Sequence, residues 1–322
     1  MKFSILSTGR MAAKMARTTL TKMDGVQKYA VASRSIGKAQ EFAAEWGFEK
    51  AYGSYEELLA DPEAELVYIA TPHPMHYENA KLCLEAGKHV LVEKAFTMNA
   101  AQAEDLIELS EKKNLLLAEG IWTRYMPSRR ILSDLLAQGV IGKVTSLTAN
   151  LGYPLTHKAR MNDPALGGGA LLDVGVYPLN FALMAIPAEV TGLWSSAVFS
   201  PEGVDWMNFT NLNFANGVTA VLHSSMLTLL DSKGTIYGEK GSLEIQNINN
   251  CEEIRQYDNQ YHLIARYEIP PQISGYEYEI ESCIRAIEAG KYECPEMPHS
   301  ETLRVMWLLD RIREQWEMAV GQ

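Results

Sequence analysis

A charged pair ends an apolar segment in the first third of the chain. The stretch HVLVEKAFTM, residues 89–98, has three apolar residues in a row and then places Glu93 and Lys94 where a strand would end. A lysine held at such a place can supply positive charge to an oxyanion that develops during a reaction. A lone lysine after a strand is more often an ordinary surface residue. The elements around Lys94 therefore decide between a functional cation and a solvated one.

A second pair of polar residues follows a run of three glycines, residues 167–169. Asp173 and Tyr177 are four positions apart, a spacing that puts two side chains on one face of a helix. The other residues of that face are apolar. By themselves, these two residues favour a helix-capping aspartate and a core tyrosine. A functional pair of carboxylate and phenol is the alternative.

A glycine-containing turn follows the first apolar run. In ILSTGRMAAKM, residues 5–15, a dinucleotide-binding fingerprint of the type G-x-G-x-x-G/A would place its small residues at Ser7, Gly9 and Ala12. Gly9 lets the backbone approach a pyrophosphate, and the amides at Arg10 and Met11, where a helix starts, offer donors to it. Serine departs from the usual first glycine, and it fits the turn if its φ angle stays negative.

The end of the second expected strand carries no acidic residue. Ser33 lies 24 residues after Gly9, near the place where a carboxylate would bind the adenosine ribose 2′-hydroxyl of NAD. A hydroxyl and two cations, Ser33, Arg34 and Lys38, occupy this region instead. A guanidinium suits a 2′-phosphate, although a solvated loop arginine is the alternative. The sequence therefore predicts that NADP(H) is preferred as cofactor, with NAD(H) possible.

The first part of the chain alternates short apolar runs with helical stretches. This order implies β-α-β units and a doubly wound, parallel Rossmann sheet. In such a sheet ligands bind at the carboxyl ends of the strands, where Gly9, Arg34, Pro72 and Lys94 all fall. Lys94 is thus expected to face the cofactor. The expected strands are Phe3–Thr8, Tyr29–Ser33, Leu66–Thr71, Val90–Glu93 and Leu115–Glu119, and the helices are Met11–Lys22, Lys38–Trp46, His76–Ala86 and Ala100–Lys113.

From about residue 122 the pattern becomes rich in strands separated by turn signals. We expect an α+β domain with a large, mostly antiparallel open sheet, so that residues 1–121 form the Rossmann domain and 122–322 the substrate-binding domain. The expected strands are Val144–Leu151, Val190–Phe199, Asn208–Phe214, Val218–Ser225, Gly234–Tyr237, Ser242–Gln246, Glu252–Tyr257 and His262–Tyr267, and the helices are Ile131–Ala137, Gly175–Met184, Tyr276–Ala289 and Glu301–Met318.

The composition is that of an acidic globular protein. The 322 residues contain 29 Lys and Arg against 40 Asp and Glu, a formal net charge of −11, and 47% hydrophobic residues. An acidic surface repels phosphate backbones, so nucleic acid is not expected as a partner. The four cysteines show no C-x-x-C spacing, and no apolar run approaches the roughly 18 residues of a membrane span. We expect a reduced, cytoplasmic protein without a membrane segment.

Four longer motifs resemble one enzyme family. The third strand region ends in A-T-P-x-x-x-H, residues 70–76, and a later strand ends in Glu93-Lys94, similar to the glucose–fructose oxidoreductase and inositol dehydrogenase (Gfo/Idh/MocA) superfamily. AEGIWTRYMP, residues 118–127, and RMNDPALGGGALLDVGVYPLN, residues 160–180, resemble its dihydrodiol dehydrogenase and xylose dehydrogenase branch. The resemblance covers essentially the whole chain. Ala95 departs from it, because the family has a proline there that holds a cis bond, and the sequence leaves open whether the bond before Ala95 is cis.

The resemblance implies a catalytic constellation of Lys94, Asp173 and Tyr177. The residues expected to bind the cofactor are Ser7, Gly9, Arg10, Met11, Ser33, Arg34, Lys38, Thr71, Pro72, His73, His76, Glu93 and Lys94. The residues expected to bind the substrate are Trp122, Arg124, Tyr125, Arg160, Asp173 and Tyr177. No third ligand stands near the two histidines, so they are expected to line the nicotinamide pocket, and no metal is expected.

The expected activity is an NADP(H)-dependent oxidation of a secondary alcohol, either a trans-dihydrodiol or a sugar such as xylose. Two alternatives remain. One is a glycosidase that uses a tightly held NAD for transient oxidation, and the other is a non-catalytic NADP-sensing protein. A broad open sheet must cover its second face, so a homodimer or higher homo-oligomer through the C-terminal sheet is also expected.

Overall fold

The computed structural model describes residues 1–320, which form two compact units. The first unit comprises residues 1–125 and 272–306, and the second comprises 126–271 and the chain from residue 307. The boundary expected after residue 121 assigns segment 272–306 to the second domain, whereas its contacts are with the first. The amide of Leu117, for example, donates to the carbonyl of Tyr292 in this returning segment.

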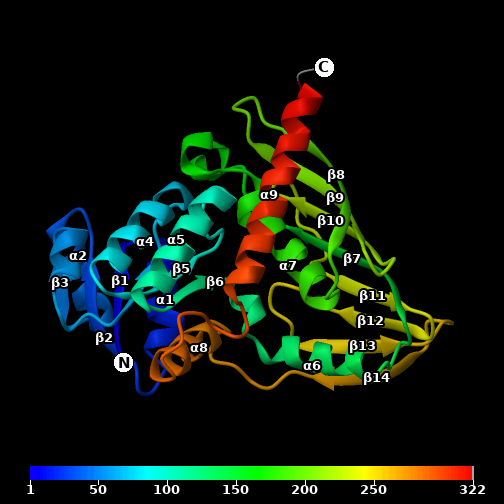
Figure 1. Ribbon diagram of the computed structural model, residues 1–322, viewed down its shortest axis with the longest axis horizontal. Helices are drawn as coiled ribbons and strands as arrows, with labels where there is room; N and C mark the ends of the chain where they lie inside the picture. The colour runs from blue at the N-terminus through cyan, green and yellow to red at the C-terminus, as the bar shows by residue number, and fades with distance from the viewer. Residues whose placement is uncertain (321–322) are drawn as a thin grey trace. The chain divides into compact units, whose positions relative to one another are not determined.

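The first unit contains a six-stranded parallel sheet in the order β3-β2-β1-β4-β5-β6. This order reverses at β1, as in the doubly wound sheet predicted from the sequence, and Figure 1 shows α4 and α5 side by side against the sheet. The strands are β1 (Lys2–Leu6), β2 (Gln27–Ala32), β3 (Lys50–Tyr52), β4 (Leu66–Ile69), β5 (His89–Glu93) and β6 (Leu117–Gly120), and the helices are α1 (Arg10–Met15), α2 (Ile36–Trp46), α3 (Tyr55–Leu59), α4 (His76–Glu85), α5 (Ala100–Lys113) and α8 (Glu277–Glu288).

Two elements of this unit, β3 and α3, were not expected from the sequence, and α1 is shorter than expected because Ala16–Leu20 continues it as a π-helical turn. A sequence signal for α3 exists. Ser54 accepts a hydrogen bond from the amide of Glu57, and the Glu57 carboxylate accepts one from the amide of Gly53. These reciprocal bonds resemble a capping box, S-x-x-E, which marks the start of a helix.

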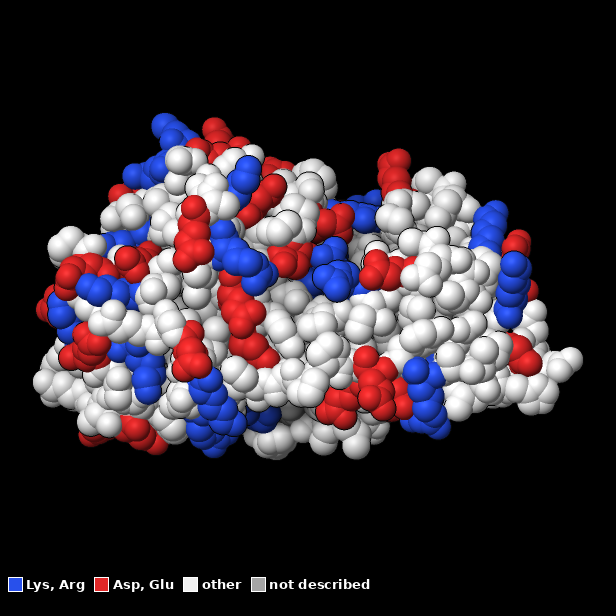
Figure 2. Space-filling view, turned by 90° about the horizontal axis from the view of Figure 1, so that it is seen from below, with Lys and Arg blue, Asp and Glu red and all other residues white. Residues whose placement is uncertain are grey.

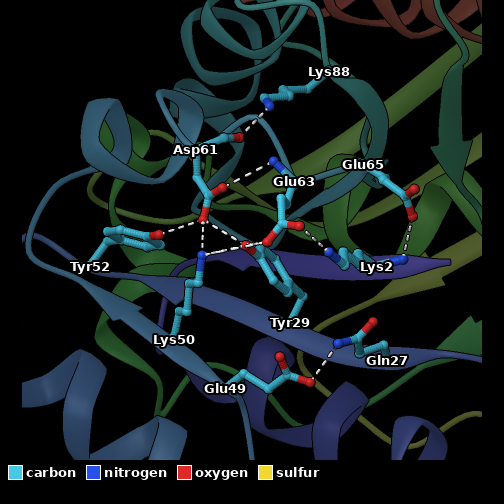
Figure 3. A network of polar contacts seen from close by, with 10 residues as sticks. All are labelled: Lys2, Gln27, Tyr29, Glu49, Lys50, Tyr52, Asp61, Glu63, Glu65 and Lys88. Carbon is cyan, nitrogen blue, oxygen red and sulfur yellow. Dashed lines mark hydrogen bonds and ion pairs between the residues drawn. The ribbon is translucent and has the colours of Figure 1, made fainter.

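A buried carboxylate lies at the centre of one group of side chains in the first unit, shown in Figure 3. Asp61 accepts hydrogen bonds from Lys50, Tyr52 and Tyr29 at 2.6–2.8 Å, and Lys88 donates to its backbone carbonyl. Burial alone would raise the pKa of the Asp61 carboxyl, but these donors hold the pKa below its ordinary value. Asp61 is therefore an ionised, fully bonded link between β2, β3 and the segment that precedes β4.

The second unit is built on an eight-stranded sheet in the order β14-β13-β12-β11-β7-β10-β9-β8. All neighbouring strands are antiparallel except β7 and β10, so the predicted mostly antiparallel sheet is confirmed. The strands are β7 (Val144–Gly152), β8 (Val190–Phe199), β9 (Asp205–Phe214), β10 (Thr219–Ser225), β11 (Gly234–Gly238), β12 (Gly241–Ile245), β13 (Glu253–Tyr257) and β14 (Leu263–Glu268). The helices are α6 (Pro127–Ala137), α7 (Val176–Ala185) and the last part of α9 (His299–Val320).

Helix α7 packs against one face of this sheet and is apolar on all sides. The stretch Pro164–Ala185 contains an 18-residue window with a mean hydropathy of 1.3 and is long and apolar enough to cross a membrane by length and composition, which the sequence did not lead us to expect. However, 83% of this window is buried inside the protein, as is usual for a core helix of a globular protein. Its apolar character is thus explained by packing against β7, β10 and β11.

Charged side chains of both signs alternate in small groups over the face drawn in Figure 2. On this face the acidic residues therefore do not form one continuous patch.

Candidate functional site

A cavity of about 400 Å³ opens at the carboxyl ends of β1, β2 and β4 in the first unit. It lies where the strand order of a doubly wound sheet reverses, which is the ordinary ligand site of this architecture. Its lining residues are Ser7, Thr8, Ser33, Arg34, Ser35, Lys38, Tyr55, Thr71, Pro72 and Met75. Six of these, Ser7, Ser33, Arg34, Lys38, Thr71 and Pro72, are among the residues that the sequence assigns to the cofactor.

The turn after β1 adopts the conformation of a dinucleotide fingerprint although it begins with serine. Ser7 has a φ of +115°, so the negative φ considered for it is not observed. Its hydroxyl accepts a hydrogen bond from the amide of Gly9 at 3.0 Å, and a Cβ at Gly9 would lie 3.1 Å from that hydroxyl. A side chain at position 9 would require the Ser7 hydroxyl to shift. Ser7 holds a backbone conformation that costs about 1–3 kcal/mol for a residue with a Cβ.

The predicted helix-start residues lie beside this turn. Gly9 is the N-cap of α1, and Arg10 and Met11 form its first turn. Neither Arg10 nor Met11 belongs to the lining of the cavity. Their assignment to the cofactor stays a prediction.

The wall of the cavity formed by β2 and α2 is rich in hydrogen-bond donors. The hydroxyl of Ser33 lies 3.5 Å from that of Thr8, which joins the ends of β1 and β2. Arg34 and Lys38 follow on the same segment and also line the cavity. A hydroxyl, a guanidinium and an ammonium group thus line one side of a space large enough for part of a nucleotide. This donor set fits a phosphate group.

Tyr55 is a lining residue that the sequence analysis missed. It is the first residue of α3, directly after the Ser54 cap. Burial raises the pKa of the Tyr55 phenol, and the nearby Arg34 opposes this shift. The capping-box spacing could have placed the helix start at this position, but only the fold brings Tyr55 to Arg34.

The two predicted histidines do not line the cavity. His76 is fully buried, and its ring nitrogens lie 2.9 Å from the carbonyl oxygens of Thr71 and Ala95. Burial lowers the pKa of His76, although these carbonyl contacts favour its charged form. His73 packs edge-on against His76 at 5.6 Å between ring centroids. His76 is thus connected to the cavity through the backbone carbonyl of Thr71, which is a lining residue.

Glu93 and Lys94 end β5 as expected. Glu93 is buried, and its carboxylate accepts hydrogen bonds from the Tyr68 hydroxyl and from the Lys94 amide. The Lys94–Ala95 peptide bond is cis, which answers the question that the sequence left open. Burial raises the pKa of Glu93, while the Tyr68 hydrogen bond and the charges of Lys94 and Lys14 lower it.

The predicted substrate residues that follow β6 are buried in the first unit. Trp122 stacks on Tyr276 at 4.5 Å, the Arg124 guanidinium pairs with Glu301 at 3.0 Å, and the Tyr125 hydroxyl donates to the Glu119 carbonyl. The first two contacts join the residues after β6 to the returning segment 272–306. A substrate role for Trp122, Arg124 and Tyr125 stays a prediction.

In the second unit, Asp173 lies in a π-helical turn, Leu171–Gly175, and Tyr177 in the first turn of α7. Their spacing is therefore not that of a regular α-helix, and π-helical turns are frequent at functional sites. Arg160 Nη2 lies 3.3 Å from Asp173 Oδ1, and both side chains are partly exposed. Tyr177 is buried, with 8% of its surface exposed.

Asp205, which the sequence analysis missed, holds the loop that leads to Asp173. Its Oδ2 accepts hydrogen bonds from the Leu171 amide and the Asn208 side chain, both at 2.8 Å. A Cβ at Gly169 would lie 2.3 Å from Asp205 Oδ1, and Gly169 has a φ of +107°. Gly169 therefore has no room for a side chain beside Asp205. Burial raises the pKa of Asp205 to about 7, although both hydrogen bonds lower it.

Within residues 1–320, no group of three or more His, Cys, Asp or Glu side chains is arranged to hold a metal ion.

Comparison with known proteins connects both units to one group of enzymes. Residues 1–121 match the family described as "Oxidoreductase family, NAD-binding Rossmann fold", and residues 130–244 match the "GFO/IDH/MocA C-terminal domain". Trans-1,2-dihydrobenzene-1,2-diol dehydrogenase of Xenopus laevis is 34% identical over 328 residues, which cover 98% of this chain and 97% of that protein. The Homo sapiens protein of the same name is 32% identical, covering 98% and 96%.

Solved structures show the same similarity. A 3-ketoreductase from Actinomadura kijaniata in complex with NADP has a TM-score of 0.85 and 25% identity, covering 98% of this chain and 97% of that chain. An aldose-aldose oxidoreductase from Caulobacter crescentus has a TM-score of 0.89, covering 99% and 98%. At 22% identity this second likeness concerns the fold alone.

The strain at Ser7 predicts opposite effects of two small substitutions. Ser7→Gly should raise the melting temperature or leave it unchanged, because glycine adopts a positive φ freely and this gain offsets the lost hydrogen bond to Gly9. Ser7→Ala keeps the Cβ and loses that bond, so it should destabilise the protein by about 0.5–1.5 kcal/mol. Thermal denaturation of the three proteins compares them, and equal losses in both variants would contradict the argument.

The buried Asp205 predicts a pH-dependent stability. Its pKa of about 7 lies above the ordinary value, so the folded protein binds a proton that the unfolded chain has released. The stabilisation is present at low pH and is lost as the pH rises through about 7. Asp205→Asn does not titrate and keeps an acceptor oxygen. From pH 6 to 8.5 the wild type should lose about 1–2 kcal/mol of unfolding free energy relative to this variant. Urea denaturation measures both, and parallel pH profiles would refute the role of Asp205.

Proposed function

Because the chain belongs to the Gfo/Idh/MocA family of NAD(P)-dependent oxidoreductases, we propose that it oxidises a secondary alcohol with NADP⁺ or catalyses the reverse reduction. The observation that carries the cofactor choice is the cavity wall of Ser33, Arg34 and Lys38. A carboxylate there would repel a 2′-phosphate, whereas a hydroxyl and two cations bind it. The NADP complex of the Actinomadura kijaniata 3-ketoreductase is consistent with this choice.

The cavity has the features that a dinucleotide requires. The Gly9 turn leaves room for close approach of a pyrophosphate, and the lining donors provide for the adenosine ribose and its phosphate. When bound, the nicotinamide ring accepts or gives the hydride. The protein then has to bind the substrate, orient its hydroxyl and remove the hydroxyl proton.

We assign these tasks to the three residues that the family resemblance selects. Tyr177 takes the hydroxyl proton as general base, and Lys94 hydrogen-bonds the same oxygen and favours the ionised phenol as a nearby cation. Asp173 orients the substrate hydroxyl or Lys94. Arg160 Nη2 lies 3.3 Å from Oδ1 of this carboxylate and supports its ionised form. The positive charge of Lys94 stabilises the negative charge that develops on the substrate oxygen during the reaction.

The substrate class is a secondary alcohol on a small ring. Dihydrodiols are the first candidates, because the two relatives described above, 32–34% identical over nearly the full chain, carry the name of a dihydrodiol dehydrogenase. Sugars such as xylose are the second. Measuring NADP⁺ reduction against a panel of aromatic trans-dihydrodiols and aldoses separates the two classes.

The same assays distinguish the other two activities. A glycosidase with transient oxidation would retain its cofactor through purification and cleave a glycoside without net reduction. A sensing protein would bind NADP and show no turnover on any substrate of the panel. Lys94, Asp173 and Tyr177, all present in the chain, favour catalysis over sensing.

The cofactor proposal predicts a selective effect of Arg34→Asp. Loss of a charge-assisted phosphate contact is worth about 1.5–3 kcal/mol, so KM for NADP⁺ should rise about 10-fold to 150-fold while KM for NAD⁺ changes little. Arg17→Asp is the matched control, because Arg17 is exposed in the same unit and does not line the cavity. Equal effects on both cofactors would remove Arg34 from the phosphate site.

The catalytic proposal predicts non-additive losses at Lys94 and Tyr177. Tyr177→Phe removes the base and should lower kcat by about 10²–10⁴ with little change in cofactor affinity. Lys94→Met deletes the charge, so the remaining tyrosine should titrate at higher pH. The oxidative rate of this variant should then keep rising toward alkaline pH, past the pH at which the wild type reaches its plateau. The double variant should be scarcely worse than the less active single variant. A double loss equal to the product of the single losses would mean independent action.

We also propose a homodimer or higher homo-oligomer through the open face of the second unit's sheet. That face presents exposed apolar side chains on adjacent strands, including Trp194 at 59%, Phe209 at 40% and Val221 at 47% exposure. Contiguous exposed apolar side chains of this kind often mark a protein–protein interface. Light scattering at micromolar concentration should give at least a dimeric mass, lowered by Trp194→Arg but not by Met318→Arg on α9. A monomeric wild type would exclude this assembly.

A further inference from the structure

Tyr68 is a fully buried tyrosine whose hydroxyl has a specific partner. It is the third residue of β4, in the interior of the parallel sheet, where an apolar residue would serve the packing equally well. Its hydroxyl donates to Glu93 Oε1 on the neighbouring strand β5. Burial, followed by the charge of Glu93, raises the pKa of Tyr68 well above its ordinary value, so the hydroxyl stays a donor at every working pH.

The other oxygen of the same carboxylate contacts the residue proposed for catalysis. Glu93 Oε2 accepts a hydrogen bond from the Lys94 amide at 3.2 Å. The carboxylate of Glu93 therefore connects a phenol on β4 with the backbone of Lys94. On the following residue, the Ala95 carbonyl lies 2.9 Å from a ring nitrogen of the buried His76. The backbone on both sides of the Lys94 Cα is thus bonded to buried side chains.

We propose that Tyr68 is a positioning residue for Lys94, acting through the Glu93 carboxylate that its hydroxyl orients. This inference rests on the proposed function of Lys94, and nothing in the sequence motifs assigns a role to Tyr68. A tyrosine that served only to satisfy a buried carboxylate would affect stability alone. A positioning residue must also change the backbone of Lys94 and the pH range over which the enzyme works.

The charges around Glu93 explain why pH is an informative measurement. Glu93 faces Lys94 on its own strand segment, Lys14 on α1 and Glu279 on α8, and its charge also acts on Glu119 of β6. Burial raises the pKa of Glu279 well above its ordinary value, and the charge of Glu93 adds to this. Both Glu279 oxygens are buried and lack a hydrogen-bond partner. Of these two neighbouring carboxyl groups, Glu279 is therefore neutral and Glu93 is ionised.

Tyr68→Phe removes the hydroxyl and keeps the ring. Without this donor the pKa of Glu93 rises further, since burial then acts with one less opposing hydrogen bond. The acidic limb of the kcat profile should move to higher pH, because Glu93 is protonated earlier as the pH falls. At the plateau kcat should fall on the order of 10-fold to 100-fold, as for a reacting group displaced by about 1 Å. KM for NADP⁺ should stay within about twofold, because Tyr68 does not line the cavity.

Tyr29→Phe is the matched control. Tyr29 is also a buried tyrosine of the first unit, and its hydroxyl donates to the carboxylate of Asp61 in the network of Figure 3. Both substitutions remove a phenol from a buried carboxylate, so both should lower the melting temperature by a similar amount. Only Tyr68→Phe should move the pH profile. Equal pH profiles in the two variants would reduce Tyr68 to a structural role.

Amide hydrogen exchange tests the positioning without any turnover. In the cofactor-free protein, the Lys94 amide should exchange at least about 10-fold faster in Tyr68→Phe than in the wild type and in Tyr29→Phe. Glu93→Gln should do the same, and it serves if Tyr68→Phe does not fold. An unchanged Lys94 amide would overturn the proposal. Faster exchange in a protein that oxidises no alcohol would support the positioning role and refute the proposed function of Lys94.

Discussion

A parallel sheet buried on both faces can carry its chemistry only at the ends of its strands. The central residues of β1, β4 and β5 are fully buried, so polar side chains there need partners inside the protein. At the carboxyl ends the backbone turns away and side chains reach a common edge. The cavity lined by Ser7, Arg34 and Thr71, and the end of β5 with Lys94, all follow from this constraint.

The exceptions inside the sheet show how strict the constraint is. Tyr68 and Glu93 are buried polar residues on adjacent strands, and they satisfy each other. The buried Asp61 carboxylate likewise has its partners inside the protein, because it accepts hydrogen bonds from Tyr29, Tyr52 and Lys50. In the second unit Asp205 satisfies the amide of Leu171, so the loop that precedes Asp173 is also held by a buried carboxylate. Buried carboxylates therefore hold neighbouring segments together in both units, because unpaired they would be costly.

The residues proposed for binding and catalysis come from both units of the chain. Lys94 and the cofactor cavity belong to the first unit, and Asp173, Tyr177 and Arg160 belong to the second. The proposed oxidation needs residues of both units, because hydride transfer requires the bound nicotinamide and removal of the hydroxyl proton requires the Tyr177 phenol. Membership in the Gfo/Idh/MocA family explains why both sets occur in one chain.

The sequence by itself determined what depends on neighbours along the chain. The alternation of apolar runs and helical stretches predicted both sheets, because periodicity and turn chemistry are local properties. The strand ends also predicted that Ser33, Arg34 and Thr71 share the edge of the sheet at which the cavity opens. Only the tertiary structure decided the features that join distant residues. The return of segment 272–306 to the first unit, the positive φ of Ser7, and the meeting of Tyr55 with Arg34 are such features. The close packing of Gly169 against Asp205 and the hydrogen bond from Tyr68 to Glu93 are two further examples. Each depends on which side chains share a buried space, and no pattern within one segment specifies that, because the partners come from strands and loops tens of residues apart.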